Sequence, residues 1–404
     1  MKKNNSIELI AITLISILPI AFIVGSAVIN LFIILLDFLF LYELVNKKKI
    51  SYLDNKYFYS FIFIWIMLLL SLFFSSNPEN SISRAFGFIR FVFFVFSVRY
   101  FFNLDVNGLQ KKILFSWTLI TVIISLDLIY EYIFGANIVG FETPFYGRLV
   151  GFMGDQLKVG GLYFGLIAIV ISNIYYVLSK EQKINHLNHI IFYLIIFSFL
   201  GISFIIGERS NFIKIFFLIT FFIFFYERKN YLIKISFILF SIAAFYMLTT
   251  LNEGIKNRFW SAFLKPIINN PVTTITNSQY GLLYEVGIKM YNRNKVFGVG
   301  LKNFRHEIFK DEYNNAGSNH PHQFHFEILA ELGFIGYLSF ICFFLFNLYL
   351  SIKNYIRGKN LLNLGGTIFI VCSLLPFLPS GSFFTTFGAA LFWLNFAIML
   401  PKDN

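Results

Sequence analysis

Long apolar runs separated by short polar segments account for most of this chain. In helical form, about 20 apolar residues cross the ~30 Å hydrocarbon core of a bilayer. The pattern therefore predicts an all-α, polytopic membrane protein with about twelve transmembrane helices. The expected spans are residues 7–25, 27–46, 57–76, 83–103, 113–134, 156–179, 188–206, 211–227, 231–251, 324–352, 362–378 and 383–400.

One polar interruption is far longer than the others. It covers residues 252–323 and precedes the tenth expected helix. Unstructured loops of this length are uncommon in compact proteins, so we expect a folded extracytoplasmic cap. Within it, apolar residues from Tyr280 to Met290 recur at helical spacing. The chain is expected to divide into nine helices in 1–251, the cap in 252–323 and three helices in 324–404, all forming one membrane domain.

Composition and charge placement agree with a membrane location. The 404 residues are 57% hydrophobic and only 13% charged, although the formal net charge is +12. Basic residues fall mainly in short loops, and their distribution favours cytoplasmic N- and C-termini with the cap on the opposite side. No basic stretch interleaved with aromatic residues lies outside the apolar runs, so we expect membrane lipids and no nucleic acid as partners.

Outside the cap, six cations lie on short loops of the expected outer side or just inside the adjoining spans, where the charge rule predicts few. A charge near hydrocarbon is costly and usually marks a substrate pathway or a site. The two lysines among them could instead extend from a span end to the headgroups. Asp127 and Glu131, one helical turn apart, could form a proton pathway or neutralise the arginines. The six cations are Arg84, Arg90, Arg148, Lys158, Arg209 and Lys214.

Several familiar reaction motifs are absent from the sequence. It contains no Gly-rich loop followed by Lys-Ser/Thr, no His-Glu-x-x-His and no Gly-x-Ser-x-Gly. We therefore expect no nucleotide, metal or other cofactor. The remaining histidines and arginines suit a substrate with a diphosphate leaving group, because arginine binds phosphate oxygens in a bidentate manner. A neutral histidine could accept the proton of an attacking hydroxyl.

The stretch of residues 319–327 holds three of the six histidines and leads directly into an apolar run. A helix is expected to begin at Pro321, because proline suits the first helical position. Glycines on this helix would let a neighbouring helix approach closely, and the helix dipole would favour a neutral histidine in the first turn. The residues expected on one helical face are His322, His325, Leu329, Gly333 and Gly336.

The same stretch resembles the signature of bacterial O-antigen ligases and the related O-antigen polymerases. In that family a His followed by Asn, Ser or Gln precedes a Gly-x-x-Gly by nine positions. Here His322-Gln323 precedes Gly333-Phe334-Ile335-Gly336 with that spacing.

Two further segments resemble the same family. Arg209, with Ile213 four positions later, resembles an Arg-x-x-x-Leu element, with Ile in place of Leu. Residues 295–304 resemble a hydrophobic-x-Gly-hydrophobic-Gly segment, although the proline that usually precedes it is missing. Tyr280 lies near the place of another family arginine, and Arg258 lies further upstream.

The resemblance implies a GT-C-like glycosyltransferase of the bacterial inner membrane, with its active site facing the periplasm. Such enzymes transfer a glycan from undecaprenyl diphosphate without nucleotide or metal. By position, His322 is the expected catalytic base. The arginines expected to hold the diphosphate are Arg209, Arg148, Arg84 and Arg90. Supporting roles are expected for His320, His325, Gln323, Glu327, Arg258 and Arg293.

We therefore expect an O-antigen ligase that moves a polysaccharide to a lipid A–core acceptor. A polymerase that joins two undecaprenyl-linked glycans is the nearest alternative, because only the acceptor differs. A twelve-helix transporter is a more distant alternative. It predicts paired repeats and broken helices at the membrane midplane, whereas the polar residues here gather at one face beside a long cap.

Overall fold

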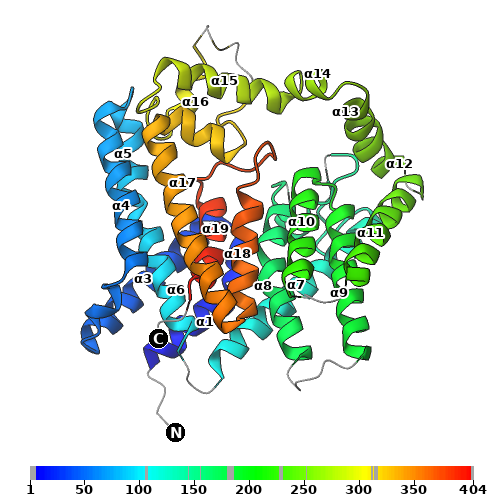
Figure 1. Ribbon diagram of the computed structural model, residues 1–404, viewed down its shortest axis with the longest axis horizontal. Helices are drawn as coiled ribbons and strands as arrows, with labels where there is room; N and C mark the ends of the chain where they lie inside the picture. Colours follow the sequence, from blue (N-terminus) through cyan, green and yellow to red (C-terminus); the bar gives the residue numbers. More distant parts are fainter. Residues whose placement is uncertain are drawn as a thin grey trace.

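The computed structural model describes residues 6–104, 108–143, 145–154, 156–179, 186–226, 231–251, 253–310, 313 and 317–401. Apart from one isolated bridge between Ala136 and Glu142, the regular structure of these residues is helical. Long helices run side by side as a bundle, and a row of shorter helices crosses one of its ends (Figure 1). The all-α class is thus confirmed.

Most of the bundle comes from the helices that precede the cap. These helices are α1 (Ser6–Ser16), α2 (Leu18–Val24), α3 (Ser26–Asn46), α4 (Lys56–Leu70), α5 (Pro78–Gly87), α6 (Ile89–Phe102), α7 (Leu109–Phe134), α8 (Val159–Leu178), α9 (His186–Ile205), α10 (Arg209–Tyr226) and α11 (Tyr231–Leu251). Short 3-10 turns follow α3 and α4 and precede α8; these are η1 (Ile50–Leu53), η2 (Ser71–Phe74) and η3 (Gly151–Met153).

The cap forms an arch over the upper end of the bundle in Figure 1. The longest cap helix, α15 (Gln279–Arg293), includes the residues whose spacing predicted a helix. A nine-residue π-helix, η4 (Lys256–Leu264), precedes it; such helices are rare and often occur at functional sites. The remaining cap helices are α12 (Glu253–Ile255), α13 (Lys265–Asn269), α14 (Pro271–Thr276) and α16 (Phe304–Glu307).

Three helices complete the bundle: α17 (Phe324–Gly358), α18 (Leu361–Ser373) and α19 (Thr386–Met399). Residues near both ends of the chain lie at the end of the bundle opposite the cap. There, Lys47 forms an ion pair with Glu8 at 2.5 Å, and Arg99 donates from Nη2 to the carbonyl of Pro401 at 2.8 Å. The first and last described helices therefore reach the same end of the bundle, away from the cap.

The helices have the length and composition of a polytopic membrane protein. Among the described residues, eight helices are long and apolar enough to cross a bilayer. A ninth span is possible if α1 and α2, which meet at a 51° bend, cross together. Three shorter apolar helices, within α11, α18 and α19, coincide with the other expected spans. The count of twelve therefore stays a prediction.

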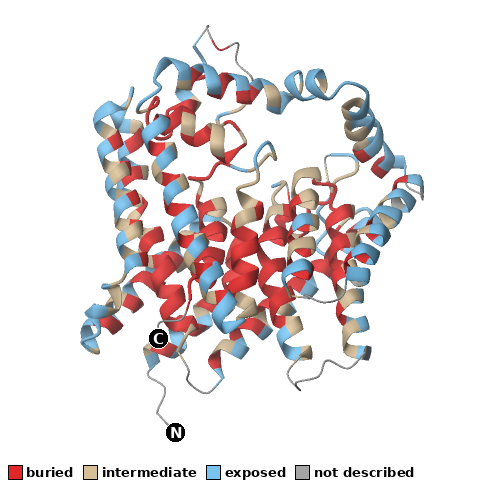
Figure 2. Ribbon diagram, in the orientation of Figure 1, coloured by how far each residue is buried: buried red, intermediate tan, exposed pale blue. Residues whose placement is uncertain are grey.

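The core lies where α6, α8, α18 and α19 pack together, and Figure 2 shows buried residues concentrated there. Trp393 is fully buried, and its ring packs edge-on against Phe61 with 5.2 Å between centroids. Outward-facing positions are also apolar; Leu239 and Phe240 of α11 are 62% and 57% exposed. Extended apolar surface of this kind is unusual on a soluble monomer and suits contact with lipid tails.

The helix expected to begin at Pro321 begins three residues later. α17 starts at Phe324, and the side chain of Gln323 accepts a hydrogen bond from the backbone N–H of Phe326 at 3.1 Å. This bond satisfies one of the N–H groups that a helix start leaves unpaired. His322 lies before the helix with a φ of +56°. The argument from a first-turn position and the helix dipole is therefore wrong for His322.

Gly333, one of the two glycines expected to receive a neighbouring helix, lies against a segment of the cap. Gly333 breaks α17 with φ 64° and ψ −165°, and the glycine-rich cap segment of residues 295–300 lies against it. Phe334 N–H donates to the carbonyl of Lys295 at 2.7 Å. At Gly336, the nearest atoms to an added Cβ belong to Leu332 of the same helix. The close approach is thus between backbones, with a cap segment filling the place expected for a helix.

Gly333→Ala is expected to lower stability by at least ~2 kcal/mol, because its backbone region is nearly restricted to glycine. In addition, a Cβ there would meet the backbone nitrogens of Phe297 and Gly298 at 2.5 Å. The measurement is the thermal unfolding midpoint of the detergent-purified protein. Gly358→Ala is the matched control, because no atom lies within 4 Å of its added Cβ. Equal midpoints for the two variants would contradict the packing described here.

Candidate active site

The loop of residues 374–385, between α18 and α19, lies at the centre of the candidate site. The apolar pattern assigned most of it to two spans, but α18 ends at Ser373 and α19 begins only at Thr386. Backbone groups outside a helix must find other hydrogen-bond partners, above all in a membrane protein. Here polar side chains of neighbouring helices supply many of them.

Carbonyl groups of the 374–385 loop accept hydrogen bonds from several residues that the sequence singled out. His325 donates from Nε2 to Leu374 at 2.8 Å, and the buried Lys214 donates from Nζ to Pro379 at 2.9 Å. These two side chains therefore hold the loop in place. Further donors are Gln323 to Leu375 (3.5 Å), Ser210 to Pro379 (2.5 Å) and Arg84 to Phe384 (3.0 Å).

Glu327 also holds the 374–385 loop, by accepting hydrogen bonds from a hydroxyl group and a backbone N–H group of that loop. Its buried carboxylate accepts one hydrogen bond from Ser382 Oγ at 2.5 Å and another from Phe383 N–H at 2.8 Å. One turn later, the buried Glu331 accepts a bond from the backbone N–H of Lys302 at 2.8 Å. Both carboxylates thus position loops around the candidate site, the first in the 374–385 loop and the second in the cap.

His322 lies in a constrained position beside this loop. Its φ of +56° is uncommon for a residue with a Cβ, and such strain is concentrated at functional sites. Its carbonyl accepts a hydrogen bond from Ser380 N–H at 2.6 Å. The imidazole ring lies 5.6 Å from the ring of Tyr280, centroid to centroid. Burial lowers the pKa of His322 from the usual 6.5, which favours a neutral ring able to accept a proton.

His320 packs directly on His322, with 3.8 Å between ring centroids. The pKa of His320 is lowered to about 3, first by burial and then by the nearby His322, Arg305 and Lys302. The ring is therefore neutral. Its Nε2 atom is buried and has no hydrogen-bond partner within the described part of the chain. His320 thus offers an unused polar atom next to the expected base.

Arg148, Arg209 and Arg258 come together at the upper end of α10, and we call them the arginine trio. Arg148 forms an ion pair with Glu208 at 3.1 Å. Arg258 donates from Nε to the carbonyl of Gly207. The pKa of Arg258 is lowered to about 10, first by burial and then by the positive charges of Arg148 and Arg209. Sequence reasoning expected two of the three as phosphate ligands and gave Arg258 only a supporting role.

The trio depends on a close approach between two loops. Gly207 has a φ of +76°, and a Cβ there would lie 2.0 Å from the carbonyl oxygen of Gly147. Next to this contact, Glu131 accepts backbone N–H bonds from Val150 at 2.9 Å and Gly151 at 2.7 Å. Glu131 therefore fixes the loop that carries Arg148. This is a different role from the proton pathway or arginine partner considered from the sequence.

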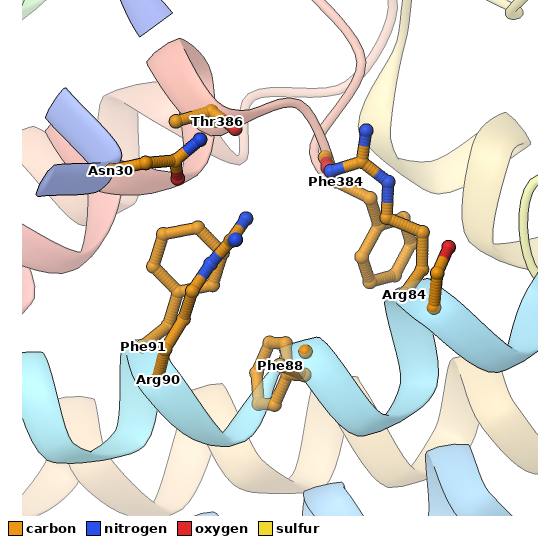
Figure 3. A pocket seen from close by; sticks show the side chains of 9 residues that line it. Asn30, Arg84, Phe88, Arg90, Phe91, Phe384 and Thr386 are labelled. Carbon is orange, nitrogen blue, oxygen red and sulfur yellow. The ribbon is translucent and has the colours of Figure 1, made fainter. Parts of the chain in front are cut away.

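Arg84 and Arg90 belong to another part of the structure. They line a cavity of about 270 Å³ between α3, α5, α6 and the start of α19 (Figure 3). Their electrostatic neighbours differ from those of the trio: Arg84 lies near Arg305, and Arg90 lies near Asp37. The four arginines expected to bind one diphosphate are thus divided between two places. Arg293 is elsewhere, exposed in the last turn of α15.

Two cations next to the histidines were not singled out from the sequence. Lys302 has a φ of +67° and is 9% exposed. Its pKa is lowered to about 8, first by burial and then by the positive charges of Arg84 and Arg305. The second of these cations is Arg305. Lys302 and Arg305 lie two and five positions after Gly300, and cations that follow such a glycine-rich turn were the available signal. Among the described residues, no cluster of three His, Cys, Asp or Glu side chains could hold a metal ion.

Comparison with known protein families identifies one family that part of the chain matches. A model of the O-antigen ligase family matches residues 191–341. The matched segment runs from α9 through the cap into α17, so it contains His322, Tyr280, Arg209 and Arg258. The resemblance found in the sequence is thereby confirmed over this segment. Among curated proteins, no sequence matches the chain.

Ser382→Ala is expected to destabilise the protein by roughly 1–3 kcal/mol, because the buried Glu327 carboxylate loses one of its two hydrogen bonds. Ser339→Ala is the matched control. Ser339 bonds only to a carbonyl of its own helix, at 2.8 Å, so its change is expected to stay within ~0.5 kcal/mol. Thermal unfolding of both purified variants checks this. A Ser382→Ala protein as stable as the control would show that Glu327 does not depend on the loop.

Proposed function

We propose, from the match of residues 191–341 to the O-antigen ligase family, that this protein is a membrane glycosyltransferase. Its donor is a polysaccharide linked to undecaprenyl diphosphate, and its acceptor is a hydroxyl group of a lipid A–core sugar. The reaction takes place on the periplasmic side of the inner membrane. His322 is the general base, and the arginine trio binds the diphosphate.

The position of Tyr280 carries this proposal. On one side its ring contacts that of His322, with 5.6 Å between centroids. On the other side Tyr280 lies within electrostatic range of Arg209 and Arg258. A proton acceptor and a group of phosphate-binding cations therefore border the same residue, as a transfer from a diphosphate requires.

The proposed step forms one bond and breaks one. His322 takes the proton of the acceptor hydroxyl as its oxygen attacks the anomeric carbon of the donor sugar. The bond between that carbon and the diphosphate oxygen breaks, and its electron pair stays with the diphosphate. Within the described residues, Arg148 of the trio forms an ion pair with Glu208, and no ion pair involves Arg209 or Arg258. A surplus of positive charge therefore remains to stabilise the departing diphosphate.

A polymerase would use the same step with a second undecaprenyl-linked glycan as acceptor. In both reactions the base takes the proton of the acceptor hydroxyl and the trio binds the donor diphosphate, so the identity of the acceptor alone distinguishes them. We favour the ligase, and the glycan analysis described next tests this choice.

His322→Ala is expected to reduce glycan transfer by at least ~100-fold, the usual contribution of a general base. The test is complementation of a deletion strain of the source organism, with surface glycan analysed by gel and membrane levels of each variant checked. His306→Ala is the matched control, since His306 is an exposed cap histidine. It is expected to transfer glycan as wild type does.

The products that accumulate distinguish the outcomes. With His322→Ala, a ligase leaves full-length glycan on undecaprenyl diphosphate, whereas a polymerase leaves single repeat units. A normal glycan profile with His322→Ala would remove this residue from the mechanism. A deletion strain with normal surface glycan would overturn the proposed function itself.

The lowered pKa of His322 predicts how transfer depends on pH. The base must be neutral, and burial lowers its pKa below 6.5. Activity is therefore expected to persist at pH 6.5 and to fall only as the pH drops through the lower value in the folded protein. The measurement is kcat/KM between pH 4.5 and 8 in a purified assay, where the acid limb reports the free enzyme. An acid midpoint above 6.5 would contradict a buried neutral base.

A further inference from the structure

The cavity bordered by Arg84 and Arg90 has features of a second anion site. We call it the α5–α6 cavity; its polar lining consists of Asn30, Ser83, Arg84, Arg90 and Thr386, with Phe384 beside them. Figure 3 shows both arginine side chains extending from the α5–α6 segment towards the loop before α19. The helices that carry them form one apolar candidate span, Pro78–Phe102. Two cations on such a span are costly unless a ligand or partner offsets them.

The protein itself offsets this charge only in part. Within the described residues, no ion pair involves Arg84 or Arg90. At Arg90, the repulsion from the like charge of Arg84 is stronger than the attraction of the Asp37 carboxylate. At Arg84, the repulsion from the positive charge of Arg305 is stronger than the attraction of the Glu331 carboxylate. The cavity therefore has a surplus of positive charge, which favours an anion.

Hydrogen-bonding groups around the cavity also lack protein partners. Arg90 Nε is a buried donor without a hydrogen-bond partner in the described chain. Asn30 Oδ1 is also buried and unpaired, but it is an acceptor and would not bind an anion. A buried polar atom without a partner costs about 1–3 kcal/mol. Arg84 uses Nη1 for the carbonyl of Phe384 at 3.0 Å, which leaves the other N–H groups of its guanidinium. An anion in the cavity would meet donors from two helices.

Size and position indicate which anion fits. The volume of about 270 Å³ lies just below the ~300 Å³ at which pockets for small molecules begin. It suits a phosphate group and excludes a whole glycan. Phe384 lines the cavity, and Ser380 of the same loop bonds to His322. Phe384 and Ser380 are four positions apart, so their Cα atoms lie at most about 14 Å apart. A molecule with its phosphate in the cavity can therefore extend to the base.

We propose that the α5–α6 cavity binds a phosphate group of the acceptor lipid, separately from the donor diphosphate at the arginine trio. This inference rests on the proposed function and adds to it a separate binding site for a phosphate group of the acceptor. Arg84 and Arg90 anchor the phosphate in the cavity, and the sugar hydroxyl of the same lipid extends past the 374–385 loop to His322. The two substrates then enter from different sides of one loop.

Arg90→Gln tests the proposal in the full-length purified protein. It is expected to raise the KM for lipid A–core by about 10-fold or more, because charged hydrogen bonds are lost. Its affinity for undecaprenyl diphosphate is expected to stay within two-fold of wild type. Arg258→Gln is expected to show the reverse pattern. Arg357→Gln is the matched control, because Arg357 is exposed at the far end of α17 and should change neither value.

Further experiments test whether the loss comes from the cavity itself, and whether the cavity binds the acceptor or an ordinary membrane phospholipid. Ser83→Trp fills the cavity while both arginines remain, and it is expected to raise the acceptor KM as Arg90→Gln does. Enzymatic removal of the lipid A phosphates should abolish the difference between wild type and Arg90→Gln. Native mass spectrometry with phosphatidylglycerol measures whether the cavity retains an ordinary membrane phospholipid.

Each outcome decides one question. If Arg90→Gln weakens undecaprenyl diphosphate binding as strongly as Arg258→Gln does, the cavity belongs to the donor site and the proposal is wrong. An unchanged acceptor KM, with or without loss of bound phosphatidylglycerol, also overturns it. If wild type neither binds undecaprenyl diphosphate nor transfers glycan, the proposed function fails instead. Acceptor-specific loss in both cavity variants supports the second site.

Discussion

The backbone of the 374–385 loop has polar groups that no helix satisfies, and the candidate site depends on how neighbouring side chains satisfy them. Backbone N–H and C=O groups outside a helix need other hydrogen-bond partners wherever they are buried. Lys214 of α10, His325 and Glu327 of α17, and Arg84 of α5 each bond to this loop. The loop therefore fixes three helices relative to one another, and His322 is held at the same place through Ser380.

Backbone contacts at glycines hold the other parts of the site together. Gly207 lies against Gly147, and Gly333 lies against the glycine-rich segment 295–300. In both places a Cβ would overlap the opposite backbone, so the approach is possible only without side chains. The first contact brings Arg148 to Arg209, and the second brings the cap onto α17 beside the histidines.

Positive charge is concentrated in two places with few carboxylates nearby. The trio has Glu208 as an ion-pair partner, and the α5–α6 cavity has the charge of Asp37 at longer range. Burying such charges costs free energy unless an opposite charge is present. Both places are therefore suited to anionic groups. This agrees with a reaction in which donor and acceptor are both phosphorylated lipids.

The sequence alone determined the all-helical membrane class, the location of the apolar helices and the stretch around His322. These follow from local patterns, since span length and hydropathy are properties of consecutive residues. Only the tertiary structure decided that Arg258 and Tyr280 join His322 and Arg209, and that Arg84 and Arg90 lie apart. It also moved the start of α17 to Phe324, where the cap bond of Gln323 outweighed the suitability of Pro321. Charges distant in the chain meet only through packing, and no local pattern encodes which loops come together.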